Sequence, residues 1–174
     1  MRRSALTLAL AALAACGTKP REESDWERRN AQPARAEEEL ALPAYPARGN
    51  LVEFGVVGAE GFHFFIDRPS LAVGKDGVVR YVLVARSAEG AENVTFEGLR
   101  CASGEQRVFA LGRPDGSWSL ARSAWRPIAT PRHVTLFREY FCPQNEPVRS
   151  ADEGVRALES GGHPFAKGLG VWGR

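Results

Sequence analysis

The fold class is decided by the stretch Val78-Val79-Arg80-Tyr81-Val82-Leu83-Val84-Ala85-Arg86. Successive side chains of a strand point to opposite faces, so Val79, Tyr81 and Leu83 share one face and the even-numbered residues share the other. The pair Asp76-Gly77, which is typical of hairpin turns, stands directly before this stretch. The sequence therefore predicts a β-strand that a hairpin joins to the segment before it.

Other short stretches on both sides of this one also predict strands, at residues 62–66, 94–101, 107–112 and 118–121. Turn-forming residues such as Pro114-Asp115-Gly116 separate them. Short strands joined by turns favour an antiparallel sheet, here of about five or six strands.

The last third of the chain changes to a helical period. A first helix is predicted between Thr130 and Pro143, with Val134, Phe137 and Phe141 on one apolar stripe. The first-turn His133 is expected at the surface.

A second helix is predicted to begin at Ser150, where Glu153 completes a capping box, and to end at Gly161. Strands first and helices last predict an α+β fold, in which the two C-terminal helices pack on one face of the antiparallel sheet.

The first fifteen residues carry the pattern of an export signal. Arg2-Arg3 precede an uncharged apolar run, at residues 5–15, that is shorter than the roughly 20 residues of a membrane span. This pattern predicts a signal peptide over residues 1–15.

The run ends in Leu13-Ala14-Ala15-Cys16, which resembles the lipobox of bacterial lipoproteins. Cys16 is therefore the expected site of lipid attachment, through diacylglycerol and a further fatty acid such as palmitate, and a membrane is the expected partner. The alternative is a secreted protein whose Cys16 carries no lipid. By analogy with lipoprotein sorting in enterobacteria, Gly17 favours the outer membrane of the cell envelope, with the domain facing the periplasm.

Composition separates a tether from a domain. Residues 16–48 combine the lipidated cysteine with Glu, Arg, Ala and Pro and are expected to form a flexible tether. A single globular domain is predicted over 49–168, followed by a C-terminal tail at 169–174.

The net charge argues against one class of partner. The chain has a formal charge of +2, and removing the two arginines of the signal peptide leaves a charge of zero. Binding to nucleic acid needs a basic excess on one face, so no nucleic acid partner is expected.

Cys101 and Cys142 are the only cysteines besides Cys16. An exported domain lies in an oxidising compartment, so a disulfide between them is predicted. Two buried free thiols are the alternative. A redox-active pair is disfavoured because no C-x-x-C spacing occurs.

The chain resembles the cryptic neisserial protein (CNP1-like) family over roughly residues 51 to 165. The resemblance is carried by Phe64-Phe65-Ile66-Asp67, Asp76-Gly77-Val78-Val79-Arg80-Tyr81, Gly90-Ala91-Glu92-Asn93-Val94-Thr95-Phe96-Glu97-Gly98-Leu99-Arg100-Cys101 and Tyr140-Phe141-Cys142-Pro143. It implies an exported or lipidated protein, without an established biochemical activity and without a catalytic residue. The order of turn, hairpin and strand ending in cysteine is also similar to surface-adhesin lipoproteins.

Candidate ligand-binding residues are few. His163, between Gly162 and Pro164, could act as acid or base, although a helix end followed by a turn also explains it. Trp125 could line a groove or fill the core, and Asp67 could serve a site or satisfy its own turn with Ser70. The histidines and cysteines lack metal-ligand spacing, so no metal, cofactor or catalytic residue is assigned.

Four arginines recur on neighbouring predicted strands and could form a cationic strip for an acidic polymer. The alternative is that they pair with Glu92, Glu97 and Glu105. The arginines are Arg80, Arg86, Arg100 and Arg107.

The sequence thus favours an anchored envelope lipoprotein with a non-catalytic binding or scaffolding domain, whose partners would be envelope proteins or peptidoglycan. Two alternatives remain open: a hydrolase-type envelope enzyme that uses His163, and a surface adhesin.

Overall fold

The computed structural model describes residues 40–167 of the chain. The predicted signal peptide, Cys16, most of the tether and the C-terminal tail lie outside the described residues. Among the described residues, no helix has the length and apolar character needed to cross a membrane.

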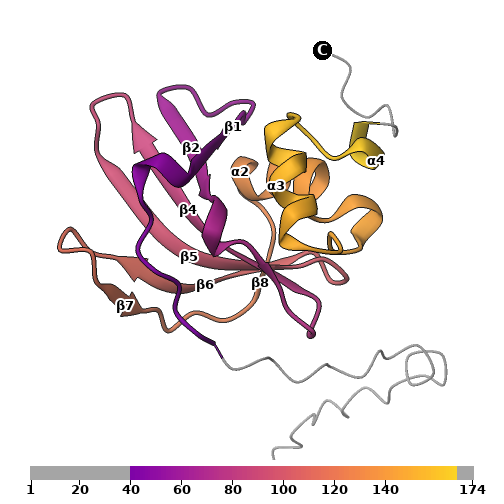
Figure 1. Cartoon of the computed structure of the whole chain (residues 1–174), viewed down its shortest axis with the longest axis horizontal. Helices are drawn as coiled ribbons and strands as arrows, with labels where there is room; N and C mark the ends of the chain where they lie inside the picture. The colour runs from indigo at the N-terminus through magenta and orange to yellow at the C-terminus, as the bar shows by residue number, and fades with distance from the viewer. Residues whose placement is uncertain (1–39, 168–174) are drawn as a thin grey trace, which may run out of the picture. The chain divides into compact units, whose positions relative to one another are not determined.

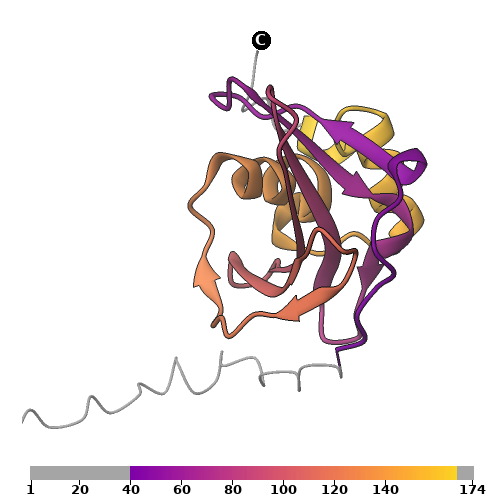
Figure 2. The same cartoon turned by 90° about the vertical axis from the view of Figure 1, so that its left-hand side faces the viewer.

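The domain is built on an antiparallel sheet with the strand order β1-β2-β4-β5-β6-β7, in which β3 also pairs with β4 and β8 with β6. The sheet is curved rather than flat (Figure 2). This architecture confirms the predicted antiparallel sheet, which the two shortest strands extend to eight. The strands are β1 (Leu51–Phe54), β2 (Phe62–Asp67), β3 (Ala72–Val73), β4 (Val78–Ser87), β5 (Glu92–Arg100), β6 (Glu105–Gly112), β7 (Trp118–Leu120) and β8 (Arg126–Pro127).

The helices gather on one face of the sheet (Figure 1), as the α+β prediction requires. They are α2 (Pro131–Thr135), which continues into the π-helix η3 (Leu136–Phe141), then α3 (Ala151–Glu159) and α4 (Pro164–Lys167). Short 3-10 turns are η1 (Arg48–Asn50), η2 (Arg68–Ser70) and η4 (Pro143–Asn145). The helix α4 was not predicted.

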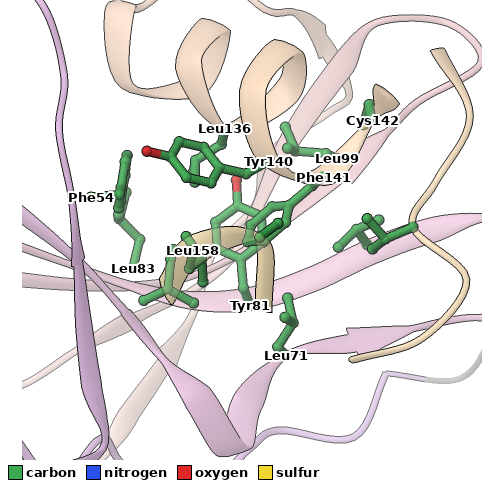
Figure 3. Packing of buried hydrophobic residues seen from close by; sticks show 14 of the residues in the cluster. Phe54, Leu71, Tyr81, Leu83, Leu99, Leu136, Tyr140, Phe141, Cys142 and Leu158 are labelled. Atoms are coloured by element: carbon green, nitrogen blue, oxygen red, sulfur yellow. The ribbon is translucent and has the colours of Figure 1, made fainter. Parts of the chain in front are cut away.

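The sheet carries a hydrophobic core on each face, so strand β4 is buried on both sides. On the helix-side core, Tyr81 and Leu83 pack among residues of η3 and α3 (Figure 3). On the opposite face Val82 and Val84 belong to a second cluster, the far-side core, with Phe96. The alternation predicted for this strand is therefore confirmed. The far-side core consists of Val82, Val84, Val94, Phe96, Phe109 and Ala110.

The buried stripe of the first helix is shifted by one position toward the N-terminus relative to the prediction. His133, Leu136 and Tyr140 are buried together with Phe141, whereas the predicted Val134 and Phe137 are half-buried. The physical reason is the π-turn, closed by the Cys142 N–H donating to the Phe137 carbonyl, which brings two consecutive aromatic residues to the sheet side.

The disulfide Cys101–Cys142 joins the end of β5 to the end of η3 and spans 41 positions of sequence. It confirms the predicted pairing. Both cysteines belong to the helix-side core, so the bond ties the helical layer to the sheet.

Part of the segment assigned to the tether is packed on the domain. Leu40 and Tyr45 contact the far-side core, and the Tyr45 hydroxyl donates to the carbonyl of Arg113 over 3.0 Å. The indole N–H of Trp118 donates to the carbonyl of Pro43 over 2.9 Å. Residues 40–47 therefore cover the face of the sheet that the helices leave open.

Candidate functional site

The residues singled out from the sequence do not form one site. Trp125 packs against the far-side core, whereas His163 lies beside Glu153 of α3, and Asp67 ends β2. No contact within residues 40–167 joins any two of these three.

Asp67 serves the turn that follows it. The Ser70 hydroxyl donates to the Asp67 carbonyl over 2.6 Å and accepts from the Val82 N–H over 2.8 Å. Burial raises the pKa of the Asp67 carboxyl, while hydrogen bonds from Ser70 partly oppose the rise. This arrangement matches the interpretation of Asp67 and Ser70 as a turn that satisfies its own backbone.

Trp125 is a half-buried wall of the far-side core. Its ring meets Phe109 edge-on at 6.0 Å, and the Arg100 guanidinium lies 4.0 Å from the ring centroid. Because one side of the ring packs on the core and a cation lies over it, the structure favours the packing role over a ligand groove.

The loop that presents His163 follows directly from the end of α3. Gly161 has a φ of +66°, and the N–H groups of Gly161 and Gly162 donate to the carbonyls of Leu158 and Ala157. This pair of bonds is a Schellman cap, which turns the chain back across the helix end. The helix therefore ends where it was predicted to end, with Ser160 as the C-cap residue and Gly161 as the left-handed residue directly after it.

The side chain of His163 is 4% exposed and both ring nitrogens have partners. Nδ1 accepts from the Phe165 N–H over 3.3 Å, and Nε2 lies 3.1 Å from Oε1 of Glu153. A nitrogen that accepts from a backbone N–H carries no proton, so Nε2 must be the donor to Glu153. The imidazole therefore has no unoccupied nitrogen to act as a base.

Glu153 is fixed by the start of its own helix. Its N–H donates to the Ser150 hydroxyl over 3.2 Å, as the capping box predicted, while its carboxylate accepts from the Arg149 N–H, one residue earlier than expected. The Arg149 N–H and then His163 lower the pKa of Glu153, so the carboxylate is ionised at neutral pH.

A cleft of about 390 Å³ opens between α3 and α4 beside this His163–Glu153 pair. We call it the α3–α4 cleft. Phe165, at its rim, is 56% exposed. The cleft is lined by Arg149, Glu153, Arg156, Ala157, Ser160, His163, Pro164 and Phe165.

The most buried polar cluster was missed by the sequence analysis. Glu97 of β5 and His133 of α2 are 1% and 2% exposed, and His133 Nε2 lies 2.7 Å from Glu97 Oε2. Thr95 donates to Oε1 over 2.7 Å, and the Tyr81 hydroxyl reaches Oε2 over 3.4 Å. The expectation that His133 lies at the surface is wrong, because the helix turns this residue toward the sheet.

Two opposing effects act on the Glu97 carboxyl. Burial alone raises its pKa, but the hydrogen bond and electrostatic attraction with His133, aided by Thr95, outweigh burial. The pKa of Glu97 is therefore lowered, and the pair links sheet and helix through an ionised group. The sequence held a signal for this cluster, because the alternation of side chains along β5 places Glu97 on the same face of the sheet as its cross-strand neighbour Tyr81.

The four arginines on the strands do not form a cationic strip. Arg86 pairs with Glu92 at 2.7 Å and Arg100 with Glu105 at 3.2 Å, as the alternative predicted. Arg80 instead pairs with Asp76, while Arg107 lies over the ring of Phe109. The expected use of Glu97 in this pairing is wrong, because Glu97 points into the opposite core.

Among residues 40–167, no group of three or more His, Cys, Asp or Glu side chains could hold a metal ion. The structure thus defines a class: a disulfide-linked α+β domain with an antiparallel sheet, helices on one face and an open cleft at the helical end.

The chain belongs to the CNP1-like family, which it matches over residues 30–159. This match confirms the resemblance found in the sequence. No curated protein and no solved structure matches the chain.

Proposed function

We propose that the protein is an envelope lipoprotein, anchored through Cys16 to the outer membrane, whose domain is a non-catalytic binding or scaffolding module. The observation that carries this proposal is the Cys101–Cys142 disulfide. Disulfides form and persist in exported proteins. The chain has three cysteines, so pairing these two leaves Cys16 for the lipid.

The state of the buried histidines supports a binding role over hydrolysis. Both nitrogens of His163 are occupied, and His133 lies 2% exposed against Glu97. A histidine that acts as a general base needs a ring nitrogen that is free to accept a substrate proton. The α3–α4 cleft is therefore proposed as a place for contacts rather than for chemistry, with envelope proteins or peptidoglycan as the partners.

The anchoring is tested by the mass of the protein isolated from bacterial membranes. We expect a chain that begins at Cys16 and carries diacylglycerol and a further acyl chain. The variant Cys16→Ser should leave the membrane fraction, whereas Cys101→Ser should keep the lipid. An intact Met1, or a Cys16 without lipid, would contradict the proposal.

The binding role is tested in intact cells. A photo-crosslinking side chain at position 160, which lines the cleft without replacing an arginine, should trap an envelope protein or peptidoglycan, while the same group at position 122 should not. Equal labelling from both positions, or none from either, would count against a binding module.

A further inference from the structure

We propose that the α3–α4 cleft binds an acidic peptide segment, with Arg149 and Arg156 holding its carboxylates and Phe165 contacting an adjacent apolar side chain. This inference rests on the binding role proposed above and assigns the chemistry of its ligand.

The first argument is the charge of the cleft. Glu153, the carboxylate among the residues lining the cleft, is held by His163, and Glu159 pairs with Arg68. Asp152, one helical turn before Arg156, is not among the lining residues. Within residues 40–167, no carboxylate lies within ion-pair distance of the Arg156 guanidinium. Arginine forms paired hydrogen bonds with carboxylates, so an exposed arginine without an ion pair at a cleft fits an acidic ligand.

The second argument is that the negative charge inside the cleft is already satisfied. One oxygen of Glu153 accepts from the Arg149 N–H over 2.6 Å, and the other faces His163 at 3.1 Å. Glu153 is therefore held in place by these two bonds. The cleft is lined by the two guanidinium groups of Arg149 and Arg156 and by this one carboxylate, which leaves an excess of positive charge.

The third argument is the exposed aromatic ring on the rim. Phe165 is 56% exposed, and its ring centroid lies 5.5 Å from that of His163. The buried imidazole thus supports one side of the ring while the rest faces solvent. Arginine and aromatic residues, including Phe, are enriched at protein interfaces, and here both kinds border the same cleft of about 390 Å³.

The fourth argument is that the walls are ordered before any ligand arrives. The His163 N–H donates to the Glu139 carbonyl, and the Schellman cap fixes the two preceding glycines. A preformed site loses less conformational entropy on binding. An acidic peptide is favoured over a phosphate polymer because a peptide can also supply an apolar side chain to the exposed ring of Phe165.

The experiment titrates the purified full chain with a short acetylated and amidated peptide that alternates glutamate with phenylalanine. The matched probe replaces each glutamate with glutamine. We expect the glutamate peptide to bind about tenfold more tightly, because charge-assisted hydrogen bonds are stronger than neutral ones. Equal binding of the two peptides would overturn the proposal.

Variants locate the site. Arg156→Gln should weaken the glutamate peptide by about tenfold and Phe165→Ala by several-fold, whereas the matched exposed-arginine control Arg122→Gln should leave binding unchanged. Equal losses in Arg156→Gln and Arg122→Gln would show general charge attraction and overturn the assignment.

A second measurement needs no variant. Backbone amide shifts of the wild-type chain should change around α3 and α4 when the glutamate peptide is added, and shifts confined to another surface would refute the site. Binding of inorganic phosphate or phosphatidylglycerol vesicles, without the peptide, would replace the acidic-peptide assignment. Failure of all these arms would leave the lipid anchor and in-cell crosslinking unaffected, so it would be distinguishable from failure of the proposed function.

Discussion

Removing the carboxylate of Glu97 should destabilise the domain more than any surface change. In Glu97→Ala, the buried His133 loses its partner at 2.7 Å, and Thr95 and Tyr81 lose their acceptor. Each buried hydrogen-bonding group that is left without its partner costs about 1–3 kcal/mol, so the free energy of unfolding should fall by several kcal/mol. A domain of ordinary stability has about 5–15 kcal/mol in total, so the variant should be marginally stable.

The assay is equilibrium unfolding in urea, followed by tryptophan fluorescence and circular dichroism with the disulfide intact. The matched control is Glu105→Ala, which breaks the half-exposed pair with Arg100 and should lower the free energy of unfolding by no more than about 1 kcal/mol.

A double variant separates the pair from the space it fills. Replacing both members, in Glu97→Leu with His133→Leu, removes the two buried polar groups together and should recover most of the stability lost in either single variant. The reasoning would be refuted if Glu97→Ala unfolded at nearly the same urea concentration as Glu105→Ala, or if the two losses simply added.

Three further outcomes follow from the same contacts. The folded-state pKa of Glu97 is lowered, so its contribution to stability is complete above the ordinary glutamate pKa of 4.5 and is lost as the pH falls through the lower folded-state value. Urea midpoints measured from pH 7 downward should therefore fall less steeply in Glu97→Gln than in the wild-type chain. An identical slope in the two proteins would contradict this. Reducing the Cys101–Cys142 disulfide should lower the free energy of unfolding by up to about 4 kcal/mol, and an unchanged unfolding midpoint after reduction would argue against it. Gly98→Ala would place a Cβ 2.7 Å from a ring carbon of Phe109 and should lower the free energy of unfolding by about 1–3 kcal/mol. Gly49→Ala is the control, because its Cβ would have nothing within 4 Å and should change the stability little. Equal melting temperatures for the two variants would show that the sheet can adjust to the added methyl group.

Local patterns were enough for the elements whose boundaries are set by neighbouring residues. The period of two in β4 predicted a strand, and Ser150 with Glu153 predicted the start of α3. The disulfide could be predicted because the chain has only two cysteines besides Cys16, and because the expected export implied an oxidising compartment.

Tertiary packing decided what the sequence could not. His133 is buried because the helical layer turns it toward Glu97, and η3 includes a π-turn that no regular period describes. The helix α4, over residues 164–167, is too short to show a period, and with it the α3–α4 cleft escaped prediction.

The packed N-terminal segment has a mechanical consequence. A force applied on the N-terminal side of residue 40 would reach the contacts of Pro43 and Tyr45 with the β6–β7 hairpin before it reached β1. These contacts would break first, before the pairing of the edge strand β1 with β2 is loaded. Further along the chain, the Cys101–Cys142 disulfide would prevent extension of the segment between the two cysteines. Tension could therefore extend the N-terminal segment while residues 101–142 stay closed.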